Sequence, residues 1–106
     1  MEKYKIVLTP YAVYDLKEIS DYLYLQTFDE NKVELVTNKI KEKIMMLSNS
    51  PLLGKELVLS KKIKTKYRTI VSKPYIIFYY VDMKQIIVVR IINSKRDYML
   101  ALKNRL

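Results

Sequence analysis

The chain has 106 residues, a length that predicts a single domain over residues 1–106. Its 20 basic and 11 acidic side chains give a net charge of +9, which favours an anionic partner. It contains no cysteine and no histidine, which excludes disulfides, thiol chemistry and a Ser-His triad, so we expect neither a metal nor another cofactor. No apolar run approaches the roughly 20 residues that cross a bilayer, so we expect a cytoplasmic protein without a membrane partner.

The first part of the chain predicts a short strand followed by a helix. Residues 3–8 alternate between polar and apolar side chains, as a half-buried strand does. Thr9 offers an N-cap and Pro10 suits the first helical position, where its missing N–H costs nothing. Apolar residues then recur at 4-3-4 spacing, which predicts an amphipathic helix that ends near Gln26. The residues of this stripe are Ala12, Leu16, Ile19 and Leu23.

A second helix is predicted from its N-cap, Asp29, to about Ser48. The connection between the two helices is short, which favours an antiparallel helical hairpin. Ser50-Pro51 ends the second helix, and we expect Gly54 to form a turn with a positive φ.

A lysine-rich segment follows, and its spacing suggests a binding surface. From residue 61 to the C-terminus there are 12 basic and 2 acidic residues. Basic side chains at positions 62, 64, 66 and 68 would share one face of a strand. The pattern leaves two partners open, which are a nucleic acid and an acidic protein segment.

Three strands are predicted at residues 65–72, 75–81 and 86–92, joined by short turns as an antiparallel meander. A last short helix is predicted over residues 97–103. The element order is β-α-α-β-β-β-α, which indicates an α+β fold in which the helical hairpin packs on one face of an antiparallel sheet. We expect the opposite face of the sheet to remain open for function.

Several stretches, in this order, resemble the RelE/ParE superfamily of type II toxin–antitoxin toxins. They are Leu8-Thr9-Pro10, Asp15-Leu16-Lys17-Glu18-Ile19, Ser50-Pro51-Leu52-Leu53-Gly54, Tyr75-Ile76-Ile77-Phe78-Tyr79-Tyr80-Val81, Val89-Arg90-Ile91-Ile92 and Lys95-Arg96-Asp97-Tyr98. The resemblance covers nearly the whole chain. It implies a small basic toxin that inhibits growth or stabilises a plasmid, and that an acidic antitoxin neutralises by folding onto it.

The superfamily divides by target, and single residues distinguish its branches. RelE-like toxins cleave mRNA on the ribosome without a metal, and they commonly place an Arg where this chain has Ile76. They also often carry a His or Tyr near the C-terminus, a role that Tyr98 would fill only loosely. The resemblance therefore favours the ParE-like branch, whose members inhibit DNA gyrase. A RelE-like endoribonuclease and a non-toxic basic nucleic-acid-binding domain remain as alternatives.

The resemblance also suggests site residues. We assign target or phosphate binding to Lys64, Lys66, Arg68, Arg90, Lys95 and Arg96. The candidates for catalysis in a ribonuclease are Arg68, Arg96 and Tyr98. We assign antitoxin binding to apolar positions of the two central strands, namely Tyr75, Ile77, Tyr79, Ile87 and Val89. A plainer interpretation of Arg90 is that it points outward or pairs with Asp82 or Asp97.

Overall fold

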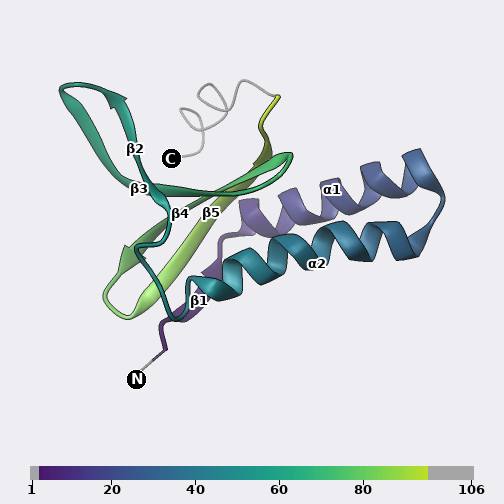
Figure 1. The fold of residues 1–106 in the computed structure, drawn as a ribbon, viewed down its shortest axis with the longest axis horizontal. Coiled ribbons are helices and arrows are strands. Elements are labelled where there is room, and N and C mark those ends of the chain that lie inside the picture. Colours follow the sequence, from purple (N-terminus) through teal and green to yellow (C-terminus); the bar gives the residue numbers. More distant parts are fainter. Residues whose placement is uncertain (1–2, 96–106) are drawn as a thin grey trace.

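The computed structural model describes residues 3–95, and it consists of one five-stranded sheet with two helices against it (Figure 1). The elements in chain order are β1 (Lys5–Leu8), α1 (Pro10–Thr27), α2 (Glu30–Met46), β2 (Lys55–Ser60), β3 (Ile63–Ser72), β4 (Tyr75–Asp82) and β5 (Gln85–Asn93). The strand order in the sheet is β1-β5-β4-β3-β2. The predicted α+β class, with a helical hairpin packed on an antiparallel sheet, is confirmed except for two details of the sheet.

Both details concern its edges. β2 was not predicted, because its side chains are nearly all exposed and two register shifts against β3 hide the alternation of a strand. β1 pairs with β5 in parallel, so the sheet is mostly but not wholly antiparallel. The predicted helix over residues 97–103 lies outside the described residues.

The two helices begin and end where local chemistry directs them. The hydroxyl oxygen of Thr9 accepts a hydrogen bond from the backbone N–H of Ala12 at 3.2 Å, and Pro10 opens α1. Phe28 ends α1 in the left-handed conformation, with φ 49°. The Asp29 carboxylate then caps α2 by accepting from the N–H of Asn31 at 2.9 Å. Among the described residues, neither helix is both long and apolar enough to cross a membrane.

The main core lies between the helices and the sheet, where α1 contacts β5 and α2 contacts β3. Its fully buried side chains include Ile40 from α2, Ile77 and Tyr79 from β4, and Val88 from β5. Burial of each large apolar side chain contributes about 1.5–3 kcal/mol of transfer free energy. This core fixes the position of α1 over the end of β5, where the groove described below is found.

The opposite face of the sheet is not bare. Phe78, Val89 and Ile92 form a second buried cluster there, with exposed fractions of 0, 7 and 2%. Leu57 of β2 and Tyr67 of β3 are among the half-buried side chains that pack against it. The prediction that this face is left open is therefore wrong at its centre, where Phe78, Val89 and Ile92 are buried.

β5 contains a bulge that changes which side chains face the helices. Phe78 pairs with Arg90, whereas Tyr79 pairs with Val88, so β5 has one residue more than β4 at this point. As a result Val88 and Ile91 both lie in the helix-side core, although they are three positions apart and alternation would place them on opposite faces. Arg90, two positions after Val88, also faces the helices and contacts Asp15 of α1.

Candidate functional site

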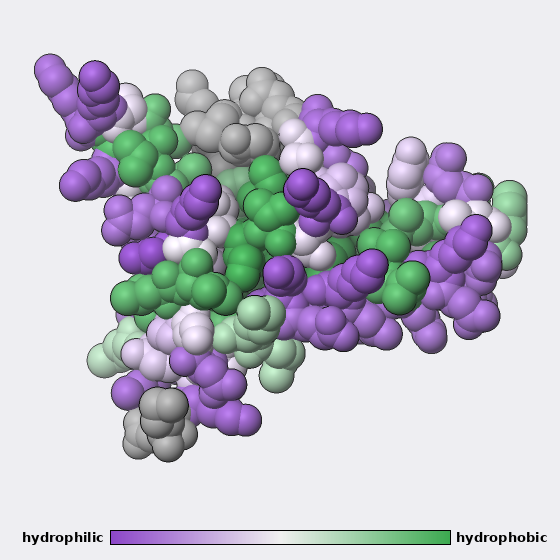
Figure 2. Space-filling model, viewed as in Figure 1, coloured by the Kyte–Doolittle hydropathy of each residue, from purple (hydrophilic) through white to green (hydrophobic). Residues whose placement is uncertain are grey.

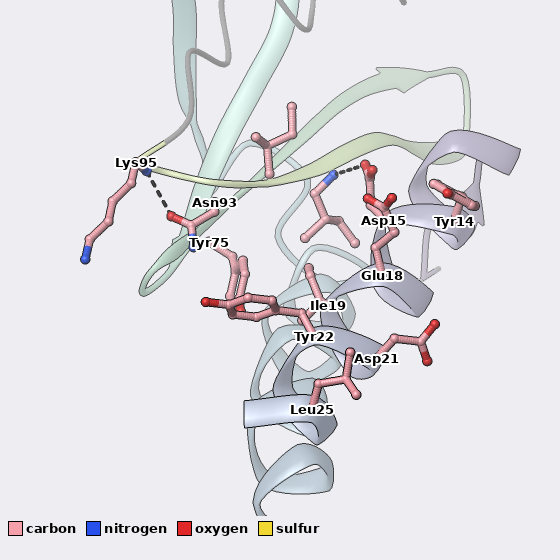
Figure 3. Close-up of a pocket in the computed structure, with 12 residues that line it drawn as sticks. Tyr14, Asp15, Glu18, Ile19, Asp21, Tyr22, Leu25, Tyr75, Asn93 and Lys95 are labelled. Atoms are coloured by element: carbon pink, nitrogen blue, oxygen red, sulfur yellow. Dashed lines mark hydrogen bonds between the residues drawn. The ribbon is translucent and has the colours of Figure 1, made fainter. Parts of the chain in front are cut away.

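A groove of about 700 Å³ lies between α1 and the C-terminal end of β5, and we call it the α1–β5 groove (Figure 3). The α1 side chains that line it are Tyr14, Asp15, Glu18, Ile19, Asp21, Tyr22 and Leu25. The sheet contributes Tyr75, Ile91, Ile92 and Asn93, and Lys95 follows β5.

The walls of the groove are apolar, whereas its rim carries charges of both signs. Tyr22 and Leu25 are 60 and 65% exposed, although both are large. Glu18 and Asp21 add carboxylates from α1, and Lys95 lies on the other side of the groove (Figure 3). Such a surface suits a partner with apolar side chains in the middle and polar side chains around them.

Two tyrosines of the groove, Tyr14 and Tyr75, have raised pKa values. Burial raises the pKa of Tyr75 above its ordinary value, and the nearby Tyr22 adds to the effect. The pKa of Tyr14, which is 59% exposed, is raised mainly by its hydrogen bond to the carboxylate of Glu18. Both hydroxyls can donate hydrogen bonds at neutral pH, where even an ordinary tyrosine is protonated.

Asp15 of α1, which lines the groove, forms a buried ion pair with Arg90 of β5. Arg90 donates from Nε to Asp15 Oδ2 at 2.8 Å and from Nη2 to Oδ1 at 3.0 Å, a two-point contact. Asp15 Oδ2 also accepts from the backbone N–H of Ile91 at 2.9 Å. This contact raises the pKa of Arg90 and joins α1 to the bulge in β5.

The assignment of Arg90 to target or phosphate binding is contradicted by this geometry. Its side chain is buried, with 8% of the residue exposed, and its guanidinium is already held by a carboxylate. The plainer interpretation is closer, but the partner is Asp15 and not Asp82 or Asp97. Sequence spacing missed Asp15, although a carboxylate in line with the apolar stripe of α1 does indicate a buried cation as its partner.

Arg68 is partly engaged in the fold. Its Nη1 donates to the carbonyl oxygen of Gly54 at 2.8 Å, and Nη2 lies 3.5 Å from the Glu56 carboxylate. Gly54 N–H in turn donates to the hydroxyl of Tyr79 at 2.9 Å, and that hydroxyl donates to the Pro51 carbonyl at 2.8 Å. One fifth of the Arg68 side chain stays exposed, at 21%.

Gly54 is needed for close approach and not for a positive φ, so that expectation is wrong. A Cβ at this position would lie 2.6 Å from the Thr69 carbonyl oxygen and 2.7 Å from the Tyr79 hydroxyl. No side chain fits there without movement of the backbone.

Lys64 and Lys66 are exposed on β3, as predicted, but Lys66 also contacts aromatic rings. Its Nζ lies 4.2 Å from the ring centroid of Tyr80 and 5.5 Å from that of Tyr67. Lys95 is exposed at the groove, and its backbone N–H donates to Asn93 Oδ1 at 2.9 Å. Arg96 and Tyr98 lie outside the described residues, so their roles stay predictions.

The five residues assigned to antitoxin binding do not share a surface. Tyr75, Ile77 and Tyr79 are buried in the helix-side core, whereas Ile87 and Val89 lie on the opposite face of the sheet. The helices cover the odd-numbered side chains of β4, so these five positions cannot form one contact surface. Of the five, Tyr75 lines the α1–β5 groove.

Comparison with known proteins places this geometry in a family. Residues 6–98 match the family model described as ParE toxin of the type II toxin–antitoxin system parDE. The chain belongs to this family. The predicted resemblance is confirmed at the level of the ParE-like branch, and the chain is a toxin component of a type II toxin–antitoxin module. No match was found among curated protein sequences.

Solved structures with the same fold include three of low sequence identity. A chromosomal ParDE toxin–antitoxin system from P. aeruginosa has 22% identity and a TM-score of 0.69, with 86% of this chain and 96% of that chain covered. The toxin–antitoxin complex RelBE2 from Mycobacterium tuberculosis has 19% identity and a TM-score of 0.60, with 88 and 93% covered. A conserved hypothetical protein from Helicobacter pylori has 21% identity and a TM-score of 0.50, with 88 and 97% covered. At these identities, the likeness is one of fold.

The described residues offer no obvious site for a metal, since nowhere in residues 3–95 do three carboxylates gather closely enough to hold one. What the described part of the ParE toxin provides is an apolar groove beside α1 and a set of exposed lysines on β3.

Proposed function

We propose that this toxin inhibits DNA gyrase in the cytoplasm and that a cognate antitoxin neutralises it. The observation that carries the proposal is the match of residues 6–98 to the ParE toxin family. Ile76 supports it, because it stands where RelE-like ribonucleases commonly place an Arg, and here it packs against the apolar cluster around Phe78. The absence of histidine leaves few groups for acid–base cleavage of RNA.

The α1–β5 groove is our candidate for the antitoxin site. Its exposed apolar walls would be covered by apolar side chains of the antitoxin, since a soluble protein gains free energy by removing such surface from water. We expect acidic residues of the antitoxin to contact Lys95. We expect neutral or basic antitoxin residues beside Glu18 and Asp21 on the opposite rim. The solved ParDE and RelBE2 assemblies, which share the fold, are toxin–antitoxin systems, and this favours such a partner.

The target is tested by a plasmid supercoiling assay with purified gyrase. We expect the wild-type chain to inhibit supercoiling or to trap DNA breaks. Arg96→Ala should lose this effect, because the family resemblance places a functional cation there. Lys41→Ala, which removes one exposed cation from α2, is the matched control and should retain it.

Absence of any effect on gyrase at protein excess would overturn the proposed target. In that case, mRNA should be examined in a translation reaction for cuts in codon register. Cleavage that depends on Arg68 and Arg96 would establish the RelE-like alternative.

The antitoxin site is tested separately by affinity measurements with the cognate antitoxin. Leu25→Glu should weaken the complex at least tenfold, because it places a charge on the apolar wall of the groove. Leu35→Glu is the control, since Leu35 is similarly exposed, at 59%, but lies on α2 away from the groove. Equal affinities of both variants would show that the antitoxin binds elsewhere.

A further inference from the structure

The hairpin formed by β2 and β3 extends beyond the rest of the sheet. β4 pairs with β3 only from Arg68 to Ser72, so residues 63–67 of β3 pair with β2 alone. We call residues 55–67 the β2–β3 ribbon, and Figure 1 shows it projecting away from the helices. A two-stranded antiparallel ribbon of this kind is narrow enough to enter the major groove of duplex DNA.

The free end of the ribbon carries a dense set of lysines. Lys61 and Lys62 form its turn, and Lys64 and Lys66 follow on β3; all four are exposed. The two ion pairs found within residues 3–95 use Arg68 and Arg90, so none of the four lysines is neutralised by a described carboxylate. In Figure 2 hydrophilic side chains project from this end of the molecule, with hydrophobic surface between them. The charge is therefore available to a partner.

Lys66 is held in place while it stays exposed. Its Nζ lies 4.2 Å from the Tyr80 ring centroid, and the Tyr80 and Tyr67 rings contact each other edge to face at 5.6 Å. A cation over an aromatic ring is stabilised by about 0.5–1 kcal/mol at an exposed site. Less side-chain entropy remains to be lost when this ammonium group meets a phosphate.

The outer edge of the ribbon is poorly suited to accept a strand from another protein. β2 has register shifts between Glu56 and Val58 and between Val58 and Ser60, which interrupt a regular edge. Bulges twist an edge strand and protect it from further pairing. They also increase the twist of the ribbon. A ribbon that is twisted, cationic and closed to strand addition fits a polyanion better than it fits a peptide.

We propose that the β2–β3 ribbon binds duplex DNA through its phosphates, with Lys61, Lys62, Lys64 and Lys66 as the contacts. This binding would be independent of base sequence, since the ribbon supplies cations and few groups that read base edges. It is a property of the toxin alone and does not depend on which enzyme the toxin inhibits. A gyrase inhibitor with this property would contact the DNA that gyrase holds as well as the enzyme.

The test is fluorescence anisotropy with a labelled duplex of about 20 base pairs, two turns of B-DNA, and the purified full-length chain. We expect a Kd of about 1–100 μM that weakens steeply between about 50 and 200 mM salt, as counterion release requires. Lys62→Gln/Lys64→Gln should weaken binding about tenfold at the lower salt and reduce the salt slope by about two. Lys39→Gln/Lys41→Gln, which removes the same charge from α2, should change the Kd less than twofold.

Three results would overturn the proposal. The first is no binding of duplex at the lower salt, and the second is equal weakening by the two double variants, which would reflect net charge alone. The third is tighter binding of a single-stranded RNA of the same length, which would make RNA the ligand. Thermal unfolding of both variants verifies that these exposed substitutions leave the fold intact. The assay contains no gyrase, so its outcome is separate from that of the supercoiling experiment.

Discussion

Asp15 is the residue on which the junction of α1 and β5 depends. It accepts three hydrogen bonds, two from Arg90 and one from the backbone of Ile91, in a buried setting. Asp15→Asn should lower the free energy of unfolding by about 3–5 kcal/mol, because it leaves the charge of Arg90 buried without an anion. This is a large part of the roughly 5–15 kcal/mol that stabilises a small domain. Urea unfolding followed by circular dichroism measures it.

Two control variants separate this effect from a general effect of charge on α1. Asp21→Asn removes an exposed carboxylate from the same helix and should change stability by less than about 0.5 kcal/mol. The double variant Asp15→Leu/Arg90→Met should be more stable than Asp15→Asn, since it removes both charges. If the double variant is as unstable as Asp15→Asn, the unpaired charge of Arg90 is not the cause of the lost stability.

Gly54 offers a second test at a single residue. Its φ is not positive, so an alanine is compatible with the backbone and would stabilise the fold by about 0.4–1 kcal/mol if space allowed. A Cβ would instead meet the Thr69 carbonyl and the Tyr79 hydroxyl. We therefore expect Gly54→Ala to lower the free energy of unfolding by about 1–3 kcal/mol. Increased stability in thermal unfolding would disprove the close approach, and Leu53→Ala, next to it and exposed, is the control.

At the scale of elements, Thr9 connects α1 to the sheet as well as capping it. Its hydroxyl accepts from the N–H of Ala12 and donates to the carbonyl oxygen of Val89 at 2.9 Å. Thr9→Ala should lower the free energy of unfolding by about 1–2 kcal/mol. Asp29→Ala removes only the local cap of α2 and should cost less, by up to about 1 kcal/mol. Equal losses in urea unfolding would mean that the bond to Val89 contributes nothing.

The helices and central strands were predictable because their determinants are local. Thr9, Pro10 and Asp29 mark helix starts, and apolar periodicity marks α1, α2 and the strands from β3 to β5. β2 was missed because its burial comes from only one partly covered side chain, Leu57. An edge strand of this kind is defined by its pairing with β3, which no local pattern reports.

The candidate site was less predictable from the sequence than the fold, and the bulge in β5 is one reason. Strict alternation from Val88 onward would place Ile91 on the face away from the helices, but the extra residue brings it under α1. Arg90 keeps the helix-side facing of Val88 and meets Asp15, 75 residues earlier in the chain. The α1–β5 groove arises from this long-range contact, so sequence spacing could identify its residues only as parts of a helix and a strand.

At the scale of the whole molecule, the net charge of +9 opposes folding, because like charges are brought together in the compact state. Within residues 3–95 there is one exposed ion pair, Arg68–Glu56, that salt can weaken. The buried pair of Asp15 and Arg90 is little screened. Added salt should therefore stabilise this protein by screening repulsion more than it weakens attraction.

We expect the Tm to rise by a few degrees between about 50 and 500 mM NaCl, equivalent to about 0.5–1 kcal/mol. Lys62→Gln/Lys64→Gln should be more stable than the wild type at low salt and should show a smaller rise. Lys39→Gln/Lys41→Gln lowers the net charge by the same two units. Because these lysines share α2 with Glu34 and Glu42, the rise in Tm of this variant with salt should stay close to that of the wild type. A Tm that falls with salt, or identical responses of the two variants, would mean that repulsion is not concentrated in the β2–β3 ribbon. If only Lys62→Gln/Lys64→Gln shows a smaller rise in Tm with salt, the charge repulsion lies mainly in the β2–β3 ribbon. This is the surface that we propose binds DNA, and an anionic partner would relieve the repulsion there.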